Sequence, residues 1–350
     1  MDKTKLDQLI EVMIKEGASD LHLSSGRRPT IRVSGELIAL TKYAPLSKED
    51  TLSVLSLLAG GDRKKEFLET HELDFSYGAG QGTRFRGNAF VQQGAVGIAL
   101  RLIPGKVATL EELNLPPVLR DFAMRKQGFF LVVGPVGHGK STTLAAMIDI
   151  INKERTEHIV TIEDPIEFIY EAGSSIIDQR EVGSDSRDFH IALQSVFRQD
   201  VDVIMVGEMR NPETIATAVT ASETGHLVLS TLHTNNAAQT IDRIINTFPP
   251  DGQNQIRVQL SQSLAGIFSQ RLIPRISGGV IPAYELLINN SAVANLIREG
   301  RTHEINVVIE TGLEEGMINM DRTLTELVRQ GEITQEQAQA YTFNSKMLRV

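Results

Sequence analysis

The hydrophobic pattern of the first forty residues predicts one helix followed by short β-strands. Apolar side chains recur at helical spacing between Leu6 and Ile14, and Gly17 stands where such a helix should end. Ser34-Gly35 separates two short apolar runs, as a two-residue hairpin turn does. The runs that predict strands are 20–23, 30–33 and 36–40. The chain therefore opens with an amphipathic helix that has a core face, followed by a hairpin.

A second helix and further strands follow in the next sixty residues. The pattern from Thr51 to Leu68 predicts a helix that is broken at Gly60-Gly61. The apolar runs that predict strands after it are 73–77, 83–90 and 97–103. One helix, then strands, then a helix and more strands indicate a small α+β domain.

Arginines stand on two of these predicted strands. Side chains alternate along a strand, so Arg84 and Arg86 point to one side and Phe85 points to the other. Arg101 is set among apolar neighbours on the last strand. An arginine cluster on a small sheet is usually a solvated face. A role directed at phosphate is the alternative interpretation.

The pattern changes after a connector that contains Pro104-Gly105 and Pro116-Pro117. From about residue 121, apolar strand-like runs alternate with helical runs, which indicates a mainly parallel sheet covered by helices. The strands predicted here are 129–133, 158–162, 201–206 and 227–230. We therefore predict an N-terminal domain at 1–104, a linker at 105–120, and an α/β domain at 121–350 with a helical C-terminal part.

Composition narrows the class of protein. The 350 residues include no cysteine, which excludes disulfides and thiolate zinc sites and fits a reducing cytoplasm. The net charge of −9 gives no basic footprint for nucleic acid. No secretion signal and no apolar run of membrane-spanning length is present, so we expect membrane association only through a partner.

A glycine-rich stretch, 134–142, joins the first strand of the α/β domain to its first helix. Its residues fit the pattern G-x-x-x-x-G-K-[ST], in which backbone N–H groups and a helix N-terminus surround nucleotide phosphates. Lys140 would reach the β- and γ-phosphates, and the Ser141 hydroxyl would hold Mg²⁺. The stretch predicts a site for ATP and Mg²⁺ formed by Gly134, Gly137, His138, Gly139, Lys140, Ser141 and Thr142. His138 occupies a variable position of the motif, and we expect no catalytic part for it.

Acidic residues follow the later strands at the edge where ligands bind in such sheets. Glu208 comes after the apolar run 203–206 and is our candidate for orienting or deprotonating the attacking water. Gly207 stands where a Walker B motif often has Asp, so a carboxylate from elsewhere should assist the metal. Glu163, Asp164 and Glu167 are available, although a helix-cap or surface role for one or two of them stays open. His233, at the end of the fourth strand, could sense phosphate or be structural.

Several longer motifs make the chain similar to a known family, the secretion ATPases of type II secretion and type IV pili, and within it to the PilT-like pilus retraction motors. The resemblance covers nearly the whole chain. The matching segments are 18–22, Arg84-Phe-Arg86 with 88–90, the phosphate loop, 161–167 (similar to the Asp box), 206–210 (similar to the atypical Walker B) and 224–234 (similar to the His box).

The resemblance implies a fold and a set of roles. The fold is a PAS-like N-terminal domain followed by a RecA-like P-loop ATPase domain, in subunits that form a hexameric ring. Glu208 would be the catalytic glutamate, Glu167 would lie near Mg²⁺, and His233 would lie near the γ-phosphate. Arg86 and Arg101, with Arg84 as a weaker third, would be arginine fingers offered to nucleotide in the ring.

The resemblance also suggests a biological role. It predicts a cytoplasmic ATP-hydrolysing motor that powers pilus retraction, and thereby twitching motility, through an inner-membrane platform protein. A paralogous retraction ATPase is a further candidate partner. Extension ATPases usually carry a longer N-terminal region and a four-cysteine zinc site, which this sequence lacks. The alternatives are a regulatory paralogue, a pilus assembly or type II secretion ATPase, and a RecA-like nucleic-acid motor, against which the acidic charge argues.

Two departures from the family pattern are visible. Ala294 stands where retraction motors typically have arginine, which bears on coupling to the pilus and leaves the ATPase chemistry unchanged. In the phosphate loop, Val136 and His138 replace the usual Thr and Ser. Because backbone N–H groups do most of the phosphate binding there, we expect nucleotide affinity to survive.

Overall fold

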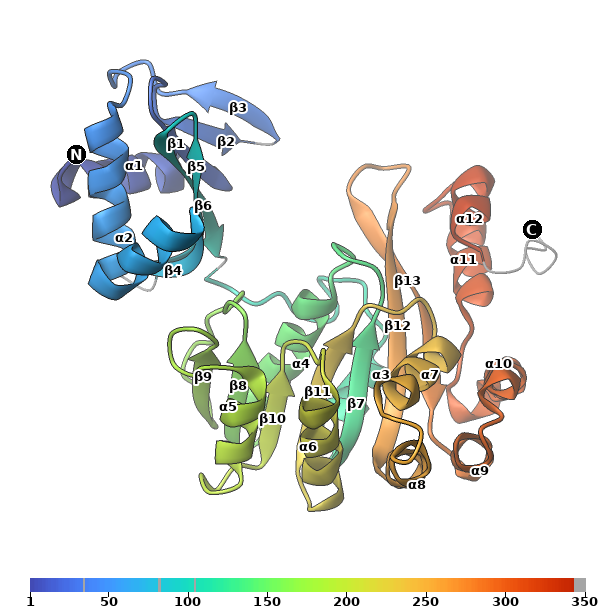
Figure 1. Ribbon diagram of the computed structural model, residues 1–350. Coiled ribbons are helices and arrows are strands. Elements are labelled where there is room, and N and C mark those ends of the chain that lie inside the picture. The colour runs from blue at the N-terminus through green and yellow to red at the C-terminus, as the bar shows by residue number, and fades with distance from the viewer. Residues whose placement is uncertain (34, 81–82, 104, 343–350) are drawn as a thin grey trace. The chain divides into compact units, whose positions relative to one another are not determined.

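The computed structural model describes residues 1–33, 35–80, 83–103 and 105–342, and these residues divide into two compact units (Figure 1). The N-terminal unit comprises Met1–Lys106 together with Pro165–Tyr170, and the second unit comprises the other described residues from Val107 on. The sequence pattern places 165–170 in the C-terminal domain, whereas the structure groups it with the N-terminal unit. Ser34 of the predicted hairpin turn, residue 104 at the predicted boundary and 343–350 at the predicted domain end lie outside the described residues.

The N-terminal unit contains two helices and a six-stranded antiparallel sheet in the order β3-β2-β1-β6-β5-β4. Its elements are α1 (Lys3–Lys15), β1 (Asp20–Ser24), β2 (Thr30–Val33), β3 (Glu36–Ala39), α2 (Lys48–Thr70), β4 (Glu72–Gly80), β5 (Thr83–Gln92) and β6 (Ala95–Ile103). The α+β prediction for this part of the chain is therefore confirmed in its order of elements.

The helices begin and bend where the sequence indicates. Asp2 caps α1 by accepting the Lys5 N–H, and α1 ends one residue before Glu16. Ile14 is 45% exposed, so the core face of α1 is narrower than its periodicity predicts. Gly60 has φ 71° and ψ 178° inside α2, which confirms the predicted break. The kink therefore has a local cause, since this backbone conformation favours glycine.

The two faces of this sheet differ in chemistry. Leu21, Leu100 and Phe75 belong to the apolar core that the sheet shares with α1 and α2. A Cβ on Gly87 would lie 2.3 Å from the Phe75 ring, so only glycine leaves room for that ring. In the neighbouring row of the sheet, Asp20, Arg101 and Arg86 stand opposite one another on β1, β6 and β5. Because side chains alternate, this charged row lies on the face opposite the helices.

The second unit is built on a seven-stranded sheet in the order β13-β12-β7-β11-β10-β8-β9, in which only the edge strand β13 runs antiparallel to its neighbour (Figure 1). Its strands are β7 (Gly128–Val133), β8 (His158–Glu163), β9 (Ile176–Glu181), β10 (Val203–Val206), β11 (Leu227–Leu232), β12 (Leu264–Pro274) and β13 (Val280–Ile288). The four predicted strands are present, and β9, β12 and β13 are additional to the prediction.

Helices cover both faces of this sheet. They are α3 (Val118–Ala123), α4 (Lys140–Glu154), α5 (Phe189–Val196), α6 (Pro212–Glu223), α7 (Ala237–Thr247), α8 (Gln253–Ser263), α9 (Ser291–Glu299), α10 (Ile305–Thr311), α11 (Met320–Arg329) and α12 (Gln335–Tyr341), with the short turns η1 (Thr302–Glu304) and η2 (Leu313–Glu315). Strands β7, β10 and β11 are buried along their whole length, as expected for parallel strands covered on both faces. The mixed α/β class with a mainly parallel sheet is confirmed.

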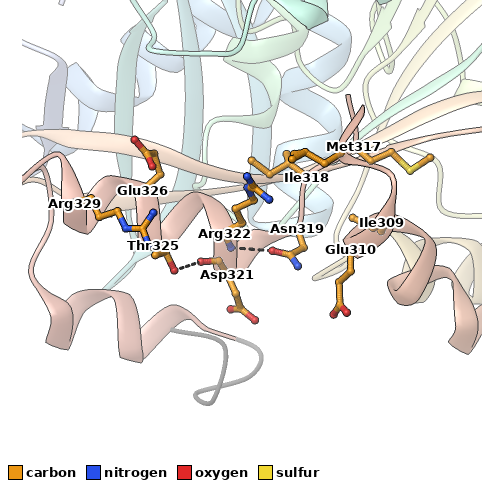
Figure 2. A pocket seen from close by; sticks show the side chains of 11 residues that line it. Ile309, Glu310, Met317, Ile318, Asn319, Asp321, Arg322, Thr325, Glu326 and Arg329 are labelled. Atoms are coloured by element: carbon orange, nitrogen blue, oxygen red, sulfur yellow. Dashed lines mark hydrogen bonds between the residues drawn. The ribbon is translucent and has the colours of Figure 1, made fainter. Parts of the chain in front are cut away.

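A cavity of about 620 Å³ lies among the C-terminal helices, between α10, η2 and α11 (Figure 2). Arg322 and Thr325 of α11 line it, and the Thr325 hydroxyl donates to the Asp321 carbonyl at 2.8 Å. None of the residues that the sequence singles out for nucleotide chemistry lines this cavity. In the described part of the chain, no helix is both long enough and apolar enough to cross a membrane.

Candidate functional site

The phosphate loop leaves the carboxyl end of β7 and enters α4, as the sequence predicts. Gly137 and Gly139 have φ of 80° and 78°, a backbone region in which glycine avoids the strain that other residues would carry. A Cβ on Gly134 would lie 2.3 Å from the Gln270 carbonyl oxygen of β12. The loop therefore needs glycines both for its turn and for its close approach to the neighbouring strand. The first turn of α4 follows at once, so its N-terminal N–H groups face the space at the loop.

Three of the predicted site residues meet at this edge of the sheet. Lys140 donates to the Pro135 carbonyl at 2.8 Å, and its Nζ lies 3.2 Å from Nδ1 of His233. The Nε2 of the same ring lies 3.5 Å from the Glu208 carboxylate. The register explains the meeting, because Leu232 of β11 pairs with Val133 of β7, immediately before the loop. The structure thus brings Lys140, His233 and Glu208 into one chain of contacts.

The protonation of His233 follows from its neighbours. The Lys140 ammonium has only donors, so the Nδ1 beside it acts as the acceptor and a neutral ring carries its proton on Nε2. Burial lowers the pKa of His233, and the charge of Lys140 lowers it further, against the opposing charge of Glu208. His233 is therefore neutral near pH 7 and presents its N–H to the Glu208 carboxylate.

The charge of Glu208 is held by cations around it. Burial raises the pKa of its carboxyl, but the hydrogen bond and charge of Arg210, with the charge of Lys140 and the neighbouring His233 ring, outweigh burial and leave the pKa below its usual range. Arg210 donates to Glu208 Oε2 at 2.8 Å. A carboxylate that stays ionised is suited to accept a hydrogen bond from a water molecule and fix its position.

We expect Arg210→Gln to move the acidic limb of the kcat/KM profile for ATP to higher pH. Without the guanidinium, the pKa of Glu208 rises, so the carboxylate becomes protonated at a higher pH as the pH falls. The profile of kcat/KM reports groups of the free enzyme, which is the state described by these contacts. Arg243→Gln, which removes an exposed charge from α7, is the matched control. An unshifted limb in Arg210→Gln would contradict the pairing of Arg210 with Glu208.

The glycine before Glu208 also has a structural reason. A Cβ on Gly207 would lie 3.3 Å from the Ile162 carbonyl oxygen and 3.5 Å from Cα of Glu163, so a side chain such as Asp would crowd β8. Gly207 donates its N–H to Ile162 at 2.8 Å and accepts the Thr231 hydroxyl at 2.6 Å. These bonds fix the backbone that carries Glu208 between β8 and β11.

The acidic residues after β8 lie in different surroundings. Glu163 is the last residue of β8 and is buried, and its Oε1 accepts the Thr161 hydroxyl at 2.6 Å and the Gln179 amide at 3.3 Å. Asp164 belongs to the second unit, whereas Glu167 lies in the segment 165–170 of the N-terminal unit. Catalytic roles for Glu163 and Glu167 stay predictions.

The predicted arginine fingers are carried by the N-terminal unit. Arg86 and Arg101 stand directly opposite each other on β5 and β6, and Arg84 lies two residues earlier on β5. Like charges directly opposite on adjacent strands destabilise a sheet. Asp20, opposite Arg101 on β1, accepts from its Nε at 2.9 Å. The Arg101 side chain is still 71% exposed, so this ion pair leaves much of the guanidinium surface accessible.

Two residues around the site were missed by the sequence analysis. Arg210 lies in a matched motif, but its contact with Glu208 depends on the turn after β10. Gln270 accepts the Thr143 hydroxyl at 2.6 Å and donates to the His138 carbonyl at 2.9 Å, so it joins β12 to the phosphate loop. A signal for Gln270 is visible in the sequence as a polar side chain that interrupts an otherwise apolar run.

The loop fits a nucleotide with Mg²⁺. A Cβ on Gly134 would collide with the Gln270 backbone, so glycine there lets the loop lie against β12, and Lys140 already bonds across the loop to the Pro135 carbonyl. Within the described ranges, no three His, Asp or Glu side chains are grouped as a metal site. Mg²⁺ at nucleotide sites usually takes one or two protein ligands together with substrate phosphates, which suits the Ser141 hydroxyl at the start of α4.

Comparison with known proteins agrees with this geometry. Residues 80–346 match the family described as Type II/IV secretion system protein. The chain is 44% identical to the Type IV pilus retractation ATPase PilT of Pseudomonas aeruginosa over 95% of its length and 96% of the relative. It is 42% identical to the Type IV pilus ATPase PilU of the same organism over 99% of its length and 91% of the relative. The crystal structure of the pilus retraction motor PilT with bound ADP superposes with a TM-score of 0.90, at 44% identity and 97% coverage of both chains.

Proposed function

The chain belongs to the family of type II and type IV secretion ATPases, and from this premise we propose that it is a hexameric motor that hydrolyses ATP to power type IV pilus retraction. The observation that carries the proposal is the chain of contacts from Lys140 through His233 to Glu208, beside an intact phosphate loop. This arrangement places a phosphate-binding cation and a carboxylate for the attacking water at one edge of the sheet.

In the proposed hydrolysis, the described residues have separate roles in binding phosphate and in aligning the attacking water. Backbone N–H groups of the loop and the N-terminus of α4 bind the phosphates, and Lys140 adds a positive charge. Glu208, held ionised by Arg210, accepts a hydrogen bond from the attacking water and aligns it. His233 links the two by bonding Lys140 through Nδ1 and facing Glu208 through Nε2. When bound through Ser141, with Glu167 as a further candidate ligand, Mg²⁺ would neutralise phosphate charge.

The N-terminal unit completes the proposed site from another subunit. We assign the PAS-like fold to this unit and the RecA-like fold to the second unit. Arg86 and Arg101 would reach the nucleotide of a neighbouring subunit in the ring, with Arg84 in support, and stabilise charge on the transferred phosphoryl group. Arg86 and Arg101 stand directly opposite each other on one face of the sheet, although their like charges repel. An anionic ligand between them would relieve this repulsion, which supports a phosphate-directed role.

The motor would act in the cytoplasm at the inner face of the membrane. Its partner would be an inner-membrane platform protein of the pilus, and a paralogous retraction ATPase could share the task. Closure of the two domains around ATP would convert hydrolysis into movement. Relatives described as retraction and pilus ATPases that match nearly the full chain support this role over a nucleic-acid motor.

The test is steady-state ATP turnover of the purified protein, with the mass of the assembly measured under the same conditions. We expect turnover by a hexamer, and no stimulation by DNA or RNA. A hexamer that binds ATP without turnover would instead favour a regulatory paralogue. Expression of this protein in a strain that lacks its own retraction motor distinguishes retraction from assembly. We expect twitching to be restored, and no restoration would favour an assembly ATPase.

A further inference from the structure

The phosphate loop of this chain is fastened to β12 through the side chain of His138. The Leu272 backbone N–H donates to Nδ1 of His138 at 2.9 Å. The Gln270 side chain donates to the His138 carbonyl at 2.9 Å, so one loop residue receives two bonds from the same strand. These contacts involve the position at which the sequence departs from the usual serine of the family.

The topology explains why Leu272 needs a partner here. β12 runs parallel to β7, and their pairing ends at Val133 and Ser269. Beyond that point the chain of β7 turns away into the loop, so β7 offers no carbonyl to Leu272. An unpaired backbone N–H in a partly buried position is costly, and the His138 ring supplies the missing acceptor.

The chemistry of the ring fits this role. A backbone N–H can only donate, so Nδ1 is the acceptor and the neutral ring carries its proton on Nε2. Burial lowers the pKa of His138, and the charges of Arg271 on β12 and Lys140 on α4 lower it further. All three influences favour the neutral form, which alone leaves Nδ1 able to accept.

The loop is also pressed closely against the strand at this point. A Cβ on Gly139 would lie 2.9 Å from the Gln270 side-chain amide and 3.3 Å from a Leu272 methyl group. The loop therefore has little freedom to move toward β12, and the bond to His138 restrains it from moving away. Together these contacts hold the backbone N–H groups of the loop in a fixed arrangement.

We propose that His138 is a positioning residue that holds the phosphate loop in its nucleotide-binding conformation through Leu272 before ATP arrives. If only a fraction of the molecules has the loop in its binding-competent conformation, the apparent Kd for the ligand equals the intrinsic Kd divided by that fraction. The side chain of His138 thus acts on nucleotide affinity and has no part in the chemical step. The inference rests on the proposed ATPase function.

The test compares three variants by KM and kcat for ATP and by the Kd of a fluorescent ATP analogue. His138→Phe keeps a ring but removes the acceptor, and we expect KM and Kd to rise about tenfold while kcat stays within about twofold. His138→Asn places an oxygen acceptor near Nδ1 and should retain wild-type values within about twofold. His158→Phe is the matched control: it removes a ring whose Nδ1 lies at hydrogen-bond distance from two backbone carbonyls at the amino end of β8, away from the loop, and it should leave KM unchanged.

The outcomes separate the inference from the function it rests on. Equal changes of KM in the Phe and Asn variants, or no change in the Phe variant, would overturn the role of His138. Absence of turnover in the wild type would count against the ATPase, and the Kd values would still test His138. If His138→Phe does not fold, as judged by thermal melting and assembly mass, His138→Ala removes the acceptor without adding bulk.

Discussion

Replacing Glu208 with glutamine is expected to lower kcat for ATP about 10²- to 10⁴-fold while ATP binding persists. The amide keeps the size of the side chain but loses the negative charge that aligns the water and that pairs with Arg210 and His233. The phosphate loop and Lys140 are untouched, so the Kd for nucleotide should change by less than about threefold. Steady-state turnover and binding of a fluorescent ATP analogue measure the two effects separately.

A matched variant excludes a general effect of losing a carboxylate. Glu213 is exposed in the first turn of α6, five residues beyond Glu208, and Glu213→Gln should retain wild-type kcat. Turnover by Glu208→Gln at the wild-type rate would remove Glu208 from the chemical step. Loss of ATP binding in a folded Glu208→Gln protein would show that the residue serves binding instead.

The sequence predicts the phosphate loop and the break in α2 because both depend on local backbone chemistry. Gly137 and Gly139 need their unusual φ within the loop itself, and Gly60 kinks α2 without help from distant residues. Such features can be inferred from a few neighbouring residues. The alternation of strands and helices also places Glu208 and His233 at the carboxyl ends of two strands, which the structure shows to be neighbours in the sheet.

The strand β12 could not be predicted in the same way. Polar side chains interrupt its apolar run at 269–271, and their partners lie far away in the sequence. The Ser269 hydroxyl donates to the Asn235 carbonyl, and Arg271 donates to the Tyr341 carbonyl. Polar groups satisfied by tertiary contacts interrupt the periodic pattern, so the sequence analysis predicts no strand here. The position of 165–170 in the N-terminal unit is likewise a matter of tertiary packing.

Replacing Arg101 with alanine is expected to lower kcat about 10³- to 10⁵-fold, which corresponds to about 4 to 7 kcal/mol of transition-state stabilisation. Its guanidinium is held by Asp20 on one side and faces Arg86 on the other, so it is oriented but still largely exposed. Arg32→Ala is the matched control. Arg32 lies on the same sheet opposite Asp20 and donates to the Gly35 carbonyl at 2.6 Å, and its loss should leave kcat near the wild-type value.

Mixing two inactive variants tests whether Arg101 acts on a neighbouring subunit. In a ring assembled from Arg101→Ala and Glu208→Gln subunits, some sites combine an intact Glu208 with an intact Arg101 from the adjacent subunit. We therefore expect mixed rings to recover measurable ATP turnover that neither variant shows alone. If Arg101 acted within its own subunit, every site would lack one of the two groups, and mixing would restore nothing. Native mass measurement gives the composition of the mixed rings. ATP turnover that rises with the number of adjacent pairs containing one subunit of each variant would establish that each site is shared between two chains.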